Sequence, residues 1–229
     1  MTQFLFISLL LSFLNLTPAP SHDAFDVLLN KNVSADGKVN YKNFKAEKAA
    51  LDSYIKMLSE NAPQDNWSKN EKMAYWINAY NALTIKTIIQ NYPLSKITDL
   101  DGGKTWDVKR LTIGGKKLSL NDIENTILRP MGDARIHFAI NCAAKSCPPI
   151  LNHAFTAESL DALLEKRAAA FVNSSANTLK SNEIAVSKIF DWYGKDFGNV
   201  AVFVGKYAKT KVSSSAKVSF NDYDWRLNE

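Results

Sequence analysis

The stretch from Ser68 to Asn91 constrains the fold of this chain more than any other. Ser68 and Glu71 have the spacing of a capping box, in which each side chain accepts a hydrogen bond from a free backbone N–H at the start of a helix. Mostly apolar residues then recur at three- and four-residue steps, which places them on one face of a helix, and Pro93 follows the predicted end of that helix. The pattern predicts one long helix with a wide buried face, formed by Met73, Trp76, Ile77, Tyr80, Leu83, Thr84, Thr87 and Ile88.

Two asparagines, Asn78 and Asn81, interrupt this helix three residues apart and on the same side. Because asparagine is a poor helix former, we expect a specific reason for both. The structural interpretation, which we favour, is that their amides tie down a neighbouring loop. The functional interpretation is that one of them orients a catalytic imidazole or donates a hydrogen bond to an oxyanion.

The remaining sequence alternates short helices with short strands. We predict further helices over residues 45–60, from Ser119 to Arg129, and over 156–172 and 200–208. Hairpins are predicted around Gly114-Gly115 and Ser181-Asn182, with strands at 135–141 and 218–220. This mixture favours the α+β class, as a single domain of separated helices packed on a small, mostly antiparallel sheet.

The start of the chain has the features of a targeting segment. Phe4 to Leu16 is an apolar run that is too short to span a bilayer, which needs roughly 20 residues. Ala19-Pro20-Ser21 then offers small residues for signal peptidase. We predict a signal peptide over residues 1–21 and a single domain over 22–229, exported to the periplasm or secreted, with no integral membrane segment after cleavage; a membrane anchor or a buried first helix is the alternative.

Charge argues against nucleic acid as a partner. The chain has 28 Lys and Arg against 23 Asp and Glu, a net charge of +5, and the basic residues are scattered among acidic ones. The expected partner is a small-molecule or peptide substrate of unknown identity. No cofactor motif is present, so no cofactor is predicted.

The segment 135–153 gathers most of the reactive side chains. It contains both cysteines of the chain, Cys142 and Cys147, and two of its three histidines, His137 and His153. A thiol near an imidazole has three common interpretations: a nucleophile with its base, a disulfide near an unrelated histidine, or a metal site.

The first hypothesis is a cysteine-dependent hydrolase or acyltransferase. Cys147 is the expected nucleophile because it lies in a rigid turn before Pro148-Pro149, whereas Cys142 shares the parity of the predicted core residues and lies at the end of a strand. His137 would act as the base that activates the thiol. The residue that orients this histidine would be Asn78, Asn81, Glu124 or Asp191.

The alternatives keep the same residues but assign them other roles. A Cys142–Cys147 disulfide in an oxidising compartment would make the protein a binding or structural module, with a cleft lined by aromatic residues. A zinc site would use His137, Cys142, Cys147 and His153, but their gaps of four, four and five residues differ from the usual short ligand spacing. We therefore predict no metal.

Several motifs, in this order along the chain, resemble one known family. They are Tyr75–Ala82 (YWINAYNA), Ser119–Glu124, His137–Cys142 with Ser146-Cys147-Pro148, Phe190–Tyr193 with Asp196-Phe197, and Tyr223-Asp224-Trp225. The chain resembles the domain of unknown function 547 family over almost all of residues 22–229. The resemblance implies an exported bacterial protein or a domain of a larger plant protein, with no established activity. A kinship with papain-like and transglutaminase-like cysteine enzymes would suit the cysteine and histidine, but in a permuted order, because His137 precedes both thiols.

Overall fold

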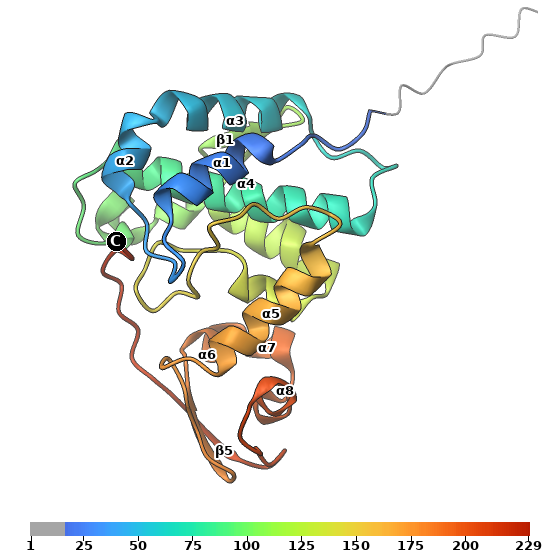
Figure 1. Cartoon of the computed structure of the whole chain (residues 1–229), viewed down its shortest axis with the longest axis vertical. Helices are drawn as coiled ribbons and strands as arrows, with labels where there is room; N and C mark the ends of the chain where they lie inside the picture. Colours follow the sequence, from blue (N-terminus) through green and yellow to red (C-terminus); the bar gives the residue numbers. More distant parts are fainter. Residues whose placement is uncertain (1–16) are drawn as a thin grey trace, which may run out of the picture.

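The computed structural model describes residues 17–229, so the predicted signal-peptide core at 4–16 lies outside the described residues. Helices predominate and strands are short, which confirms the α+β class (Figure 1). The α-helices are α1 (Asp23–Asn32), α2 (Tyr41–Ala46), α3 (Lys48–Glu60), α4 (Lys69–Gln90), α5 (Leu160–Val172), α6 (Ile189–Trp192), α7 (Gly194–Phe197) and α8 (Val200–Tyr207). The 3-10 helices are η1 (Ile97–Gly103), η2 (Thr105–Asp107), η4 (Arg129–Met131) and η5 (Ala134–Phe138), and η3 (Asp122–Leu128) is a π-helix.

The strands form two small sheets rather than the single sheet that the sequence predicts. β1 (Leu111–Ile113) and β2 (Lys116–Leu118) make an antiparallel hairpin at the predicted Gly114-Gly115 turn. β3 (Thr178–Leu179), β4 (Glu183–Val186) and β5 (Lys217–Phe220) make the second sheet in that order. β3 and β4 form the predicted antiparallel hairpin, whereas β4 and β5 are parallel because the chain crosses over through α6 to α8.

Helix α4 is the centre of the larger half of the molecule, as its sequence predicts. The capping box is present: the Ser68 hydroxyl accepts from the Glu71 N–H, and the Glu71 carboxylate accepts from the Ser68 N–H. Most of the helix is buried, with α2 and α3 packed against it and η3 against another part of its surface. Within residues 17–229, no helix is long and apolar enough to cross a membrane.

A second hydrophobic cluster forms the narrower half of the molecule, at the bottom of Figure 1. Its phenylalanine rings belong to η5, α5, α6, α7 and α8, and Phe138 of η5 contacts the others. Helix α5 links the two halves because Leu160 and Leu164 belong to the first cluster and Ala168 and Phe171 to the second. The division of the chain into one domain stays a prediction.

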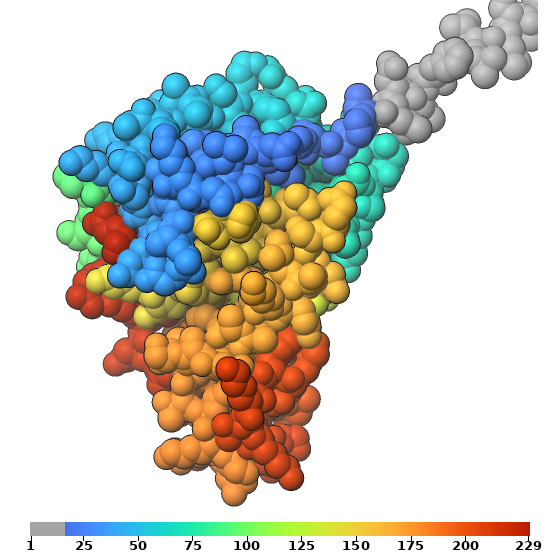
Figure 2. Space-filling model, in the orientation of Figure 1, coloured from blue at the N-terminus to red at the C-terminus, as the bar shows by residue number. Residues whose placement is uncertain are grey.

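The C-terminal segment returns to the N-terminal half (Figure 2). The Val39 N–H donates to the Asn228 carbonyl at 2.9 Å, and the Tyr41 hydroxyl donates to the Asn228 side chain at 2.7 Å. Leu227 pairs with Ala144, between the two cysteines. The last residues of the chain therefore hold the cysteine segment in place.

Two sequence predictions about local structure are wrong. Residues 135–141 form no strand; the Asp133 carboxylate caps η5 by accepting from the Arg135 N–H at 3.0 Å. The apolar–polar alternation is misleading here because His137 is as buried as its apolar neighbours Ile136 and Phe138. The helix predicted from 45 to 60 is split into α2 and α3 at Glu47.

Candidate functional site

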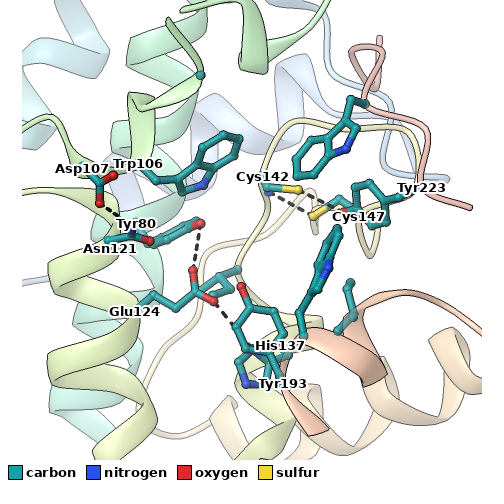
Figure 3. Close-up of a pocket in the computed structure, with 15 residues that line it drawn as sticks. Tyr80, Trp106, Asp107, Asn121, Glu124, His137, Cys142, Cys147, Tyr193 and Tyr223 are labelled. Carbon is teal, nitrogen blue, oxygen red and sulfur yellow. Dashed lines mark hydrogen bonds and ion pairs between the residues drawn. The ribbon is translucent and has the colours of Figure 1, made fainter. Parts of the chain in front are cut away.

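A cavity of about 320 Å³ opens where the elements of the two halves meet (Figure 3). We call it the central cavity. Its walls come from α4, η2, η3, η5, α6, the segment with the two cysteines, and the C-terminal segment. In Figure 3, Cys142, Cys147 and Tyr223 lie on one side, Tyr80 and Trp106 on the other, and Glu124 below, between them. Residues far apart in the sequence therefore line one cavity.

The cysteines lie on a tight loop, residues 141–147, which we call the thiol loop. Its shape depends on Asn141, whose side-chain oxygen accepts from the Ala143 N–H at 2.9 Å and whose amide donates to the Pro148 carbonyl at 2.9 Å. Ala143 has φ = +62°, a left-handed conformation that costs a non-glycine residue about 1–2 kcal/mol. The surrounding hydrogen bonds must therefore hold this turn.

Asn81 and Asn78 are the buried anchors of neighbouring loops. The Asn81 side chain donates to the Ala139 carbonyl at 3.0 Å and accepts from the Asn141 N–H at 2.8 Å. Asn78 makes the same pair of bonds with the backbone of Phe155, at 2.7 and 3.0 Å. These contacts agree with the structural interpretation of both asparagines, since every one of them goes to backbone.

The two thiols differ in exposure and acidity, in the reverse of the expected order. Cys142 is half-buried, and its Sγ lies 3.1 Å from the Tyr223 hydroxyl. Burial raises the pKa of Cys142, but hydrogen bonds from the Cys147 thiol, Tyr223 and the Ala144 N–H outweigh it, so that the pKa lies below the ordinary value. Cys147 is only 7% exposed, and burial together with its thiol neighbour raises the pKa of Cys147 well above that value.

Both thiols are free. The Cys142 N–H donates to the Cys147 Sγ at 3.0 Å, so the two residues are in direct contact. Cys142 is the thiol that combines access to the central cavity with a lowered pKa, and Cys147 is its buried neighbour.

His137 is bound to a carboxylate that the sequence analysis did not single out as a site residue. Its Nε2 lies 2.8 Å from the Asp196 Oδ2, and Arg129 holds that carboxylate through two hydrogen bonds of 2.6 and 2.8 Å. The Arg129 guanidinium lowers the pKa of Asp196, so the carboxylate is ionised and can only accept. His137 Nε2 must then carry the proton, which leaves Nδ1 as the acceptor.

The imidazole is neutral at pH 7. Burial lowers the pKa of His137 to about 4, although Asp196 opposes this shift. Its ring stacks on Tyr193 with the centroids 3.9 Å apart. In the part of the chain that the structure describes, no hydrogen bond joins His137 to either thiol. Asp191, one of the residues predicted to orient His137, is exposed and pairs with Lys188. Asp196 orients His137 instead.

Glu124 faces the free nitrogen of this histidine. It is 3% exposed; its Oε2 accepts from the Tyr80 hydroxyl at 3.2 Å, and its Oε1 lies 3.8 Å from His137 Nδ1. Neither Oε1 nor Nδ1 has a hydrogen-bond partner among residues 17–229. Burial raises the pKa of Glu124. The carboxyl is thus fully buried and next to a neutral imidazole.

The position of Glu124 follows from local sequence. Ser119 and Asp122 cap η3 reciprocally, with hydrogen bonds of 2.9 and 3.1 Å. The helix then packs on α4 through its apolar side, which includes Ile123 and Leu128. This packing turns Glu124 toward Tyr80 and the central cavity.

The four residues of the zinc hypothesis do not form one ligand set. His153 is exposed, and its Nδ1 lies 3.3 Å from the Asp26 carboxylate. Across residues 17–229, no three side chains of His, Cys, Asp or Glu are grouped so that they could hold a metal ion.

Comparison with known proteins identifies the family and no activity. No curated protein and no solved structure matches the chain. The family model described as "Protein of unknown function, DUF547" matches residues 64–172, the segment that contains α4, η3, η5 and the thiol loop. Asp196 and Tyr223 lie outside the matched segment. The match confirms the resemblance that the sequence motifs indicate, and residues 64–172 belong to the DUF547 family.

Proposed function

We propose that this protein is a thiol-dependent hydrolase or acyltransferase with Cys142 as its nucleophile. The observation that carries the proposal is that Cys142, a half-buried thiol with a lowered pKa, lines the same cavity as Glu124, a buried acid with a raised pKa. Acyl transfer needs such a pair, because one group attacks as an anion and the other supplies a proton to the leaving group. The substrate is a small molecule or a peptide end.

In the proposed reaction, the Cys142 thiolate attacks the carbonyl carbon of the substrate, and a C–S bond forms. The bond from that carbon to the leaving oxygen or nitrogen breaks, and Glu124 gives its proton to the departing atom. Water or another acceptor then attacks the thioester and returns a proton to Glu124, and the thiolate leaves. The atoms and protons balance, and no co-reactant other than the acyl acceptor is needed.

His137 supports the proton chemistry of Glu124 in this proposal. The Arg129–Asp196 pair fixes the Nε2–H tautomer, so the lone pair of Nδ1 faces Glu124 Oε1 at 3.8 Å. A shift of under about 1 Å would bring the two atoms to hydrogen-bond distance. His137 is therefore a positioning residue for Glu124. This role replaces the role of thiol base that the sequence predicts for it.

Intact-mass analysis after incubation with p-nitrophenyl acetate tests the proposal. We expect a burst of p-nitrophenolate and one acetyl group on Cys142, which Cys142→Ser abolishes. The matched variant Cys147→Ser keeps an acceptor for the Cys142 N–H and should still be acetylated. Acetylation of wild type and Cys142→Ser to the same extent would refute the proposal.

A specific contact also favours the disulfide alternative. The Cys147 sulfur accepts a hydrogen bond from the Cys142 N–H at 3.0 Å, so both free cysteines lie at one end of the cavity, and an oxidising compartment favours a disulfide between such neighbours. In that case the protein would be a binding or structural module. Mass analysis without reductant separates the alternatives, because a disulfide lowers the mass by about 2 Da and prevents acetylation.

We also propose that the protein is exported, on the basis of the apolar run at 4–16. Amino-terminal sequencing of the protein recovered from the producing cell is the test. A mature start at His22 would agree with the proposal, whereas a retained Met1 would contradict it.

A further inference from the structure

The central cavity has an unusually aromatic wall. Trp225 packs against Trp106 at 5.7 Å, against Trp192 at 5.7 Å with the rings 26° apart, and against Tyr223 at 4.7 Å between centroids. Trp192 remains 43% exposed although it lines the cavity. Large aromatic side chains normally bury their surface, so this wall has ring faces that a bound molecule can cover.

The charge of the cavity is opposite to the charge of the protein. The chain as a whole carries +5, but the lining residues include two acidic side chains, Asp107 and Glu124, and no lysine or arginine. Arg129, which is outside the lining, is bound to Asp196, and its guanidinium lies 5.4 Å from the centre of the Tyr193 ring. The cavity thus favours a positively charged group over an anion.

One buried polar atom in the cavity lacks a partner. Oε1 of Glu124 accepts no hydrogen bond within the described residues, although the residue is 3% exposed. A buried acceptor without a donor is costly, and such atoms in native structures call for an explanation. A ligand that carries N–H donors would satisfy it.

We propose that the central cavity binds the ammonium group of its substrate, a primary alkylamine, between the aromatic wall and Glu124. Aromatic faces attract cations through their quadrupole, and a primary ammonium also has N–H groups for the free Glu124 oxygen. Glu124 takes part through its accepting oxygen, and Asp107, at the exposed edge, supplies the negative charge. The inference rests on the proposed function, because it names the substrate class of the same site.

Binding to the full chain with the substitution Cys142→Ser tests the inference without any covalent step. The probes are n-butylammonium, its neutral counterpart butan-1-ol, the anion butyrate, and tetramethylammonium, which has no N–H group. Titration is followed by tryptophan fluorescence. We expect n-butylammonium to bind about tenfold more tightly than butan-1-ol, and more tightly than tetramethylammonium.

Substitutions in the cavity lining locate the binding. Trp192→Leu should weaken the binding of n-butylammonium several-fold, whereas Phe220→Leu, at an exposed aromatic residue outside the cavity, should leave it unchanged. Glu124→Leu, which takes away the accepting oxygen, should remove the preference for n-butylammonium over tetramethylammonium. Because Glu124 is buried, Asp107→Asn at the exposed edge is the second variant; it removes a charge and should reduce the preference for n-butylammonium over butan-1-ol.

Equal binding of n-butylammonium and butan-1-ol, or tighter binding of butyrate, would overturn the inference. Equal binding of the two cations would also overturn it, because the hydrogen bond to Glu124 would then contribute nothing. Failure of the proposed function is a separate result: ammonium selectivity without acetylation of Cys142 would refute catalysis alone. Acetylation without ammonium selectivity would refute the substrate class alone.

Discussion

Replacing Asn81 by alanine removes the link between the central helix and the thiol loop. The substitution takes away two buried hydrogen bonds, which leaves the Asn141 N–H and the Ala139 carbonyl without partners. Each buried backbone group that loses its partner costs about 1–3 kcal/mol. The free energy of unfolding should therefore fall by about 2–5 kcal/mol, a large fraction of the about 5–15 kcal/mol of a typical domain.

Urea denaturation, followed by tryptophan fluorescence and far-ultraviolet circular dichroism, measures this loss. At a slope of about 2 kcal/mol/M, the midpoint should move down by about 1–2.5 M. The matched control is Asn70→Ala, which makes the same change on the exposed side of the same helix and should alter the free energy of unfolding by no more than about 0.5 kcal/mol. A loss below about 1 kcal/mol for Asn81→Ala would refute the anchoring role, and loss of acetylation without loss of stability would restore the catalytic interpretation.

Three further predictions concern pH, packing and thiol acidity. Burial lowers the pKa of His22 to about 4, so between about pH 6.5 and pH 4 the unfolded state binds a proton at His22 that the folded state does not. The free energy of unfolding therefore decreases as the pH is lowered through this range. His22→Gln should make that decrease shallower by up to about 1.4 kcal/mol per pH unit, measured by denaturation curves at several pH values. Phe138→Ala opens the phenylalanine cluster and should cost about 3–5 kcal/mol by urea denaturation; a cost below 1 kcal/mol would contradict the packing. Tyr223→Phe removes a donor to Cys142 and should raise the pKa of Cys142, slowing its alkylation at pH 7 about tenfold; an unchanged rate would contradict the contact.

Sequence patterns predict the elements that depend on near neighbours. The capping box at Ser68 and Glu71, the periodicity of α4 and the two glycine- or asparagine-containing hairpin turns all involve residues within a few positions of one another. The same patterns mislead at 135–141, where apolar and polar residues alternate although all sides of the segment are buried. Alternation predicts a strand only when one face meets solvent.

The sequence groups the candidate site residues but does not predict how they pair. Glu124, His137 and both cysteines do line one cavity, because the packing of η3 and η5 brings them together. The partner of His137 is Asp196, 59 positions away, and no local spacing distinguishes it from Asp191. The choice of Cys147 over Cys142 rested on a strand that does not form. The kinship with papain-like and transglutaminase-like enzymes stays a prediction.

Alkylation of the folded protein with iodoacetamide across a pH series, read by intact mass and peptide mapping, tests the central claim most directly. We predict one label without prior reductant, on Cys142, with an apparent pKa below the ordinary value of about 8.5 and a second label, on Cys147, only after unfolding. No label until reductant is added, followed by two, would show a Cys142–Cys147 disulfide. That result would contradict the assignment of Cys142 as the nucleophile.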